Sequence, residues 1–214
     1  MIRGFKGAPV TAILLILIFA VFAVEWLAGV RESTPDFARV EILYRLGAIV
    51  PTMFADHEYW RAITGMFLHA NLLHLATNTF SLWQLGTLYE KMFGSRRFTL
   101  IYFTTGIIAS CASALFTRGV GVGASGAVLG ILGAFIFSIL RSPRWRHERW
   151  TRGLIAQLLF FAVLNLLLPM RVKNIDSVAH VAGLLSGLLL GFIPHRVPPP
   201  PPGEAIIDAR PQQS

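Results

Sequence analysis

Six apolar segments constrain this chain more than any other feature of its sequence. A helix needs about 20 residues to cross the hydrocarbon core of a bilayer, and apolar segments of about that length, or slightly shorter, recur along the chain. They are residues 8–30, 72–89, 98–116, 125–140, 153–169 and 177–193. Because backbone groups in lipid must bond within their own segment, we expect an all-α polytopic membrane protein with six transmembrane helices in one domain, residues 8–193.

Composition supports a membrane protein and argues against a nucleic-acid-binding one. The chain is 54% hydrophobic and 14% charged, whereas soluble domains are about 25% charged. Its net charge of +8 comes from short basic clusters between apolar segments, which is typical of charges that set membrane topology. Cys111 is the only cysteine, so an intrachain disulfide and a thiolate metal cluster are excluded.

Basic residues also predict the orientation. A cytoplasmic N-terminus (residues 1–7) places 12 of the 19 Lys and Arg residues inside, as the positive-inside rule favours. The first outside loop, about residues 31–61, mixes apolar and charged residues and is expected to lie in the membrane interface. The proline-rich tail, residues 194–214, is expected to be disordered and cytoplasmic. The absence of a targeting presequence favours a bacterial plasma membrane.

Polar residues interrupt three of the apolar segments. His74 and Asn78 lie four residues apart in the second segment, Ser125 opens the fourth, and His180 lies in the sixth. Polar residues inside membrane helices are functional-site candidates. With the predicted topology these three helices all run from outside to inside. The four side chains should therefore lie at a similar depth, a little below the outer surface.

This set of residues matches the needs of nucleophilic catalysis. Histidine is the usual base that activates a serine hydroxyl, and free N–H groups at a helix start can stabilise an oxyanion. Glycines spaced four apart, such as Gly183 and Gly187, together with Gly126 in the fourth segment, allow two helices to approach closely. No acidic residue lies within these segments near the level of Ser125, so the sequence predicts a Ser–His dyad.

Each residue also has an ordinary structural interpretation. Ser125 could be a helix cap, His180 a packing residue, and His74 and Asn78 interhelical hydrogen-bonding groups. His69 lies five residues before His74, on another face, so we expect it to be structural and predict no metal site. A small transporter would also carry intramembrane polar groups, but here they gather near one surface. An α/β hydrolase would require Gly at position 127, where the sequence has Ala.

Several motifs together carry a resemblance to a known family. They are Gly123-Ala124-Ser125-Gly126, Ala179-His180 followed by Gly183 and Gly187, the His69, His74 and Asn78 series, and Trp60-Arg61. At these positions the sequence resembles the rhomboid family of intramembrane serine proteases, over about residues 8–193. The resemblance implies Ser125 as nucleophile and His180 as general base. It also implies an oxyanion hole formed by His74, Asn78 and the Ser125 N–H, with Gly123 in the loop that leads to Ser125.

The resemblance assigns further roles outside the chemistry. Trp60 and Arg61 would be structural parts of the first loop, and Glu90 would stabilise the fold. The substrates would be single-span membrane proteins, cut after a small residue with no cofactor or metal, on the outer side of the membrane. The sequence departs from the family at Leu129, four residues after the serine, where an aromatic residue often supports the histidine. A catalytically inactive relative that binds client proteins is the main alternative.

Overall fold

The computed structural model describes residues 7–142, 149–167 and 176–193, which are helical apart from loops and one isolated β-bridge between Ile49 and Gly121. The helices are α1 (Pro9–Ala28), α2 (Asp36–Leu46), α3 (Arg61–Thr64), α4 (Leu72–Ser81), α5 (Thr87–Phe93), α6 (Ser95–Phe116), α7 (Ser125–Arg141), α9 (Arg149–Leu167) and α10 (Ser177–Leu190), with a π-helical turn η2 (Leu82–Gly86) between α4 and α5. The predicted tail, residues 194–214, lies outside the described residues.

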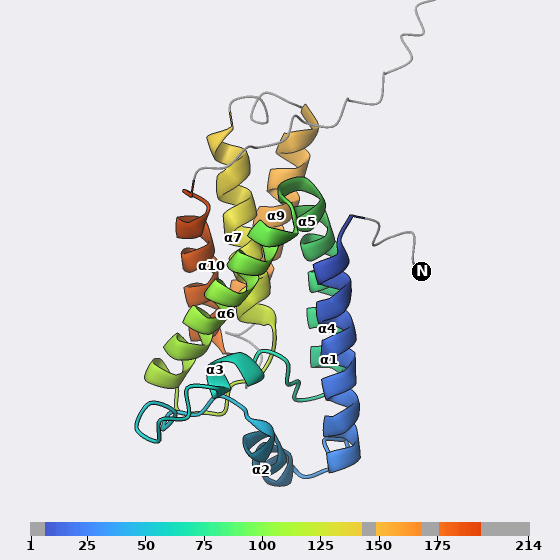
Figure 1. Ribbon diagram of the computed structural model, residues 1–214, viewed down its shortest axis with the longest axis vertical. Coiled ribbons are helices and arrows are strands. Elements are labelled where there is room, and N and C mark those ends of the chain that lie inside the picture. The colour runs from blue at the N-terminus through green and yellow to red at the C-terminus, as the bar shows by residue number, and fades with distance from the viewer. Residues whose placement is uncertain (1–6, 143–148, 168–175, 194–214) are drawn as a thin grey trace, which may run out of the picture.

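Each of the six predicted apolar segments overlaps a helix, or in the second segment the run α4–η2–α5, with boundaries that differ by a few residues. By length and composition, α1 and α6 can each cross a membrane, with mean hydropathies of 2.6 and 1.6 over their most apolar windows. The apolar helices α7 and α10 are shorter. Figure 1 shows α6, α7 and α10 running side by side through the molecule.

The second apolar segment forms a longer helix than the sequence predicts. It runs through α4, the π turn and α5 to Phe93, whereas the predicted segment ends at Tyr89. A π turn inserts extra backbone into a helix and shifts the faces on either side of it. Glu90 therefore lies within this longer helix. Its side chain contacts the beginning of α1, whereas the polar residues of α4 lie beside Gly123.

Helix α7 forms the centre of the core because every residue from Gly126 to Ile136 is buried. It packs against α10 backbone to backbone. A Cβ atom placed on Gly183 would lie 2.1 Å from the carbonyl oxygen of Gly126, and one on Gly187 would lie 2.0 Å from that of Gly130. These positions can therefore hold only glycine at this helix separation, as in small-residue interfaces of membrane helices.

The first loop contains α2, leads into α3 and is organised around Arg61, the first residue of α3. This side chain is 3% exposed, and its guanidinium donates to the carbonyl oxygens of Tyr44 at 2.7 Å and Ala48 at 3.1 Å. Its Nε donates to Glu58, and the guanidinium lies over the rings of Tyr44 and Trp60. These bonds fix the loop at the end of the molecule where α4, α7 and α10 begin (Figure 1).

Glu90 connects α5 to the beginning of α1. Its carboxylate accepts hydrogen bonds from the backbone N–H groups of Val10 at 2.9 Å and Thr11 at 2.8 Å. It also accepts from the hydroxyls of Thr11 and Ser95. The first N–H groups of a helix have no partner within the helix. Glu90 therefore caps α1 from another helix, in a site where the glutamate is 1% exposed.

Glu90→Gln is expected to lower the free energy of unfolding by about 2 kcal/mol, because an NH2 group cannot accept the bonds that one carboxylate oxygen accepts and the charge is lost. The measurement is thermal or denaturant unfolding in detergent micelles. Glu41→Gln on exposed α2 is the matched control, where an exposed ion pair with Arg45 is worth about 0–1 kcal/mol. Equal effects of the two substitutions would contradict a capping role for Glu90.

Candidate active site

Ser125 and His180 meet where α7 and α10 begin. Ser125 is the first residue of α7, and His180 lies in the first turn of α10. The His180 Nε2 and Ser125 Oγ atoms are 2.9 Å apart, within the 2.6–3.2 Å range expected of a nucleophile and its base. The neighbouring contact between Gly126 and Gly183 makes this approach possible. His180 is 6% exposed, so the imidazole is largely shielded from water.

The segment that leads to Ser125 is held against the first loop. Ile49 and Gly121 exchange two backbone hydrogen bonds of 2.9 Å, and the Gly123 N–H donates to the carbonyl oxygen of Gly65, also at 2.9 Å. Gly123 has a φ of +115°, a conformation that favours glycine. These contacts define the position of the chain immediately before the serine.

His74 and Asn78 lie beside Gly123. A Cβ atom on Gly123 would lie 2.8 Å from His74 Nε2 and 3.9 Å from Asn78 Nδ2, so both side chains reach the segment that precedes Ser125. The Asn71 side chain caps α4 by accepting the His74 N–H at 2.8 Å, and Asn78 Nδ2 donates to the His74 carbonyl at 2.9 Å. Within the described residues Asn78 Oδ1 has no hydrogen-bond partner.

The His69 ring lies against the His74 ring, although the sequence analysis placed it on another face. The two ring centroids are 5.2 Å apart in an edge-on arrangement, because His69 precedes α4 and does not follow its helical spacing. His69 is completely buried, and burial lowers the pKa of its imidazole to about 3, with a further contribution from nearby His74. His69 is therefore neutral at physiological pH, and its ring packs against the ring of His74.

Glu25, which was not among the predicted site residues, anchors His69. This residue of α1 is completely buried, and its Oε1 accepts the His69 backbone N–H at 2.7 Å. Its Oε2 has no hydrogen-bond partner within the described part of the chain. An acidic residue inside an apolar helix is itself a signal of function or of a specific contact, and that signal was available in the sequence.

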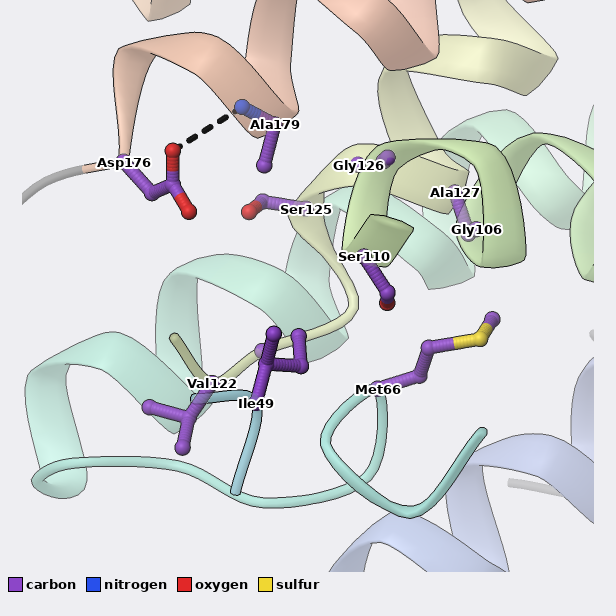
Figure 2. A pocket seen from close by; sticks show the side chains of 12 residues that line it. Ile49, Met66, Gly106, Ser110, Val122, Ser125, Gly126, Ala127, Asp176 and Ala179 are labelled. Atoms are coloured by element: carbon purple, nitrogen blue, oxygen red, sulfur yellow. Dashed lines mark hydrogen bonds between the residues drawn. The ribbon is translucent and has the colours of Figure 1, made fainter. Parts of the chain in front are cut away.

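A small cavity opens beside Ser125 (Figure 2). It is lined by residues of the first loop, of α6, of the segment before α7 and of the beginnings of α7 and α10: Ile49, Met66, Gly106, Ala109, Ser110, Val122, Gly123, Ser125, Gly126, Ala127, Asp176 and Ala179. Its volume of about 20 Å³ is sufficient for about one water molecule.

Asp176 is a carboxylate near the dyad that lies outside the predicted apolar segments, none of which contains an acidic residue at this level. It directly precedes α10, one residue outside the predicted apolar segment, and its side chain lines the cavity together with Ser125. Its Oδ1 accepts the Ala179 N–H at 2.9 Å, while its Oδ2 accepts the hydroxyl of Ser113 from α6. The sequence signal was an Asp immediately before a helix, the usual pattern of an N-cap.

The other predicted residues lie away from the dyad. Arg61 and Trp60 lie in the first loop and Glu90 lies at the opposite end of the helices, as described above. Leu129 is 1% exposed and belongs to the main apolar core, and its proposed place beneath His180 stays a prediction. In the described part of the chain, no group of three His, Cys, Asp or Glu side chains is arranged to hold a metal ion.

Comparisons with known proteins place the chain in one family. The family model described as the Rhomboid domain matches residues 56–197. The chain is 38% identical over 156 residues to "Rhomboid protease GluP" of Bacillus subtilis, which covers 73% of this chain and 30% of that protein. It is 39% identical over 153 residues to "RHOMBOID-like protein 6, mitochondrial" of Arabidopsis thaliana, covering 71% and 49%.

A third relative is similar in length. "Putative rhomboid protease YdcA" of Bacillus subtilis is 36% identical over 141 residues, covering 65% of this chain and 69% of that protein. The match spans less than half of each of the first two relatives. The family model, which matches residues 56–197, includes both Ser125 and His180.

Proposed function

The chain belongs to the rhomboid family and is therefore a polytopic integral membrane protein, and from this premise we propose that it is an intramembrane serine endopeptidase. The observation that carries the proposal is the 2.9 Å separation of Ser125 Oγ and His180 Nε2 at the beginnings of two closely packed helices. The named relatives support it, since two of them are called rhomboid proteases.

The reaction follows from the positions of the two side chains. Ser125 Oγ attacks the carbonyl carbon of the scissile peptide, and its proton passes to His180 Nε2. The tetrahedral intermediate collapses when His180 returns that proton to the leaving amine, which leaves an acyl group on Ser125. Water then attacks the ester carbonyl and gives a proton to His180, which acts as base again. His180 returns this proton to Ser125 Oγ as the ester bond breaks and the acid product departs.

The oxyanion of each intermediate needs hydrogen-bond donors. The Ser125 N–H is free of an intrahelical partner because it begins α7, and the side chains of His74 and Asn78 lie beside the adjoining Gly123. We assign these three groups to the oxyanion hole. Such donors act on charge that develops in the transition state, which is why they affect kcat.

The proposed substrates are single-span membrane proteins whose helix unwinds near its outer end. The cavity beside Ser125 holds about one water molecule, and this small size favours cleavage after a small residue. The bond to be cut is hydrolysed with no cofactor or metal. The lipid bilayer is the other partner, and nucleic acid is not one.

The proposed topology has six membrane spans, α1, the α4–η2–α5 helix, α6, α7, α9 and α10, with both termini in the cytoplasm of a bacterium. The dyad then opens to the outer side of the plasma membrane. Support comes from the basic residues and from the common end at which α4, α7 and α10 begin (Figure 1). The cavity and the polar side chains gather at that end, which disfavours a transport pathway across the membrane.

The experiment that tests the proposal incubates detergent-purified protein with a panel of single-span substrates, beside its Ser125→Ala variant. A fluorophosphonate probe, which reacts with activated serines, is applied to the same preparations. Cleavage and labelling by the wild-type chain are expected. Binding of the substrates without either reaction would favour an inactive client-binding relative.

Asn78→Ala is expected to lower kcat by about 10²-fold with little change in KM, because an oxyanion donor acts in the transition state and not on the bound ground state. The measurement is steady-state cleavage of a fluorogenic single-span substrate. Thr77→Ala is the matched control, since Thr77 is the exposed neighbour on α4. A change confined to KM would place Asn78 in substrate binding instead.

A further inference from the structure

Asp176 has no role in the Ser–His scheme, yet it is the acidic residue among those that line the cavity beside Ser125. It lines the same cavity as Ser125, and in Figure 2 its carboxylate and the Ser125 hydroxyl face the same space. It precedes His180 by four residues, and the His180 N–H donates to its carbonyl oxygen at 3.2 Å. The residue is therefore connected to the dyad through the first turn of α10.

The carboxylate of Asp176 joins α10 to α6. Its Oδ1 accepts the N–H of Ala179, which caps α10, and its Oδ2 accepts the hydroxyl of Ser113 near the end of α6. Gly121 leaves room for this pair, because a Cβ there would lie 2.8 Å from Ser113 Oγ. The beginning of the helix that carries His180 is thus fixed to a neighbouring helix by one negatively charged group.

The charge matters because His180 lies at the positive end of a helix dipole. Unpaired N–H groups and the dipole at the beginning of α10 disfavour a cation in the first turn. Catalysis requires that cation, since His180 holds the proton of Ser125 while the oxyanion exists. A carboxylate at the N-cap offsets the positive field and stabilises the imidazolium.

Among the residues that the structure describes, the other charged groups near α10 do not supply this compensation. His74 of α4 cannot supply a negative charge, because an imidazole is either neutral or cationic. Arg97 of α6 and Arg141 of α7 donate to carbonyls at the opposite end of α10, those of Ile193 and Phe192. The remaining titratable side chains of α6 are Arg96, Tyr102 and Cys111, and on α9 Arg152 is exposed. None of these groups is an anion.

We propose that Asp176 is a positioning residue of the dyad, which fixes the beginning of α10 through Ser113 and stabilises the protonated His180 that forms during catalysis. The inference rests on the proposed protease function. It assigns to a carboxylate just before the helix the electrostatic role that a third side chain of a catalytic triad would otherwise have.

The test separates the charge of Asp176 from its cap. Asn caps helices as well as Asp does, so Asp176→Asn removes the charge and retains the bond to Ala179. We expect kcat to fall about tenfold and the acid limb of the pH–rate profile to move to lower pH, because His180 becomes harder to protonate. Asp176→Glu should retain part of the rate and an acid limb nearer that of the wild type.

Ser113→Ala is the matched control for the tether. It removes the bond to α6 while the charge stays, so the acid limb should not move. Melting in detergent is measured for every variant, and Asp176→Ser, another good cap without charge, replaces Asp176→Asn if the latter does not fold. An Asp176→Asn protein with wild-type rate, or with a lower rate and an unmoved acid limb, would overturn the inference.

Wild-type and Ser125→Ala protein run in parallel keep the two proposals distinguishable. An active wild type, an inactive Ser125→Ala and an unaffected Asp176→Asn would overturn only the role of Asp176. A wild-type chain that neither cleaves substrate nor reacts with the probe would remove the protease function, and the role of Asp176 with it.

Discussion

Ser125→Ala is expected to abolish cleavage of every substrate that the wild-type chain cuts, with a loss of about 10⁴-fold or more in kcat. The substitution removes Ser125 Oγ, which lies 2.9 Å from His180 Nε2. The alanine side chain has no nucleophilic atom. His180→Ala should lose a comparable factor, because an unassisted hydroxyl is a weak nucleophile. The measurements are substrate cleavage and fluorophosphonate labelling.

Ser110→Ala provides the matched control for this experiment. Ser110 lines the same cavity and is 3% exposed, but it lies on α6. Its removal should leave both labelling and cleavage within about tenfold of the wild type. All three variants should melt close to the wild-type temperature. Residual cleavage by a folded Ser125→Ala protein would refute the assignment of the nucleophile.

Gly183→Ala is expected to damage stability and activity together. The added methyl group would lie 2.1 Å from the Gly126 carbonyl oxygen, and backbone cannot move aside without separating α7 from α10. Overpacking of this kind costs about 1–3 kcal/mol, and a displacement of about 1 Å at a catalytic pair can cost about 10²-fold in rate. The measurements are melting in detergent and kcat for the folded fraction.

Gly153→Ala is the matched control, since it makes the same substitution in another helix. Nothing lies within 4 Å of a Cβ at Gly153 of α9, and alanine favours a helix by about 1 kcal/mol over glycine. Gly153→Ala should therefore be neutral or stabilising. If Gly183→Ala behaved in the same way, the close contact between α7 and α10 would be wrong.

The candidate site was predictable from the sequence as far as helix periodicity and topology extend. His74 and Asn78 share a face because they are four residues apart, and Ser125 begins its helix as the glycine-rich turn before it indicates. The glycines Gly126 and Gly183 predicted close helices, and the structure places them in contact. These features follow from the spacing of residues along one helix, which does not depend on how the neighbouring helices pack.

Other features depended on how helices rotate and where loops fold. Glu25 and His69 are 44 residues apart and bond only because α1 lies beside the segment before α4. The contact of Asp176 with Ser113 spans 63 residues and lies just outside an apolar segment, so hydropathy did not mark it. No spacing rule relates such pairs.

The sequence by itself determined that the chain is a bundle of apolar helices with a serine, two histidines and an amide near one level, because hydrophobic length and helical periodicity are local properties. Only the tertiary structure decided which polar groups meet. The π turn in the second segment, the cap that Glu90 provides for α1 and the bonds of Asp176 all arise from the packing of helices that are distant in sequence. Buried polar groups must find partners wherever the fold places them, and those partners are set by the three-dimensional arrangement of the helices.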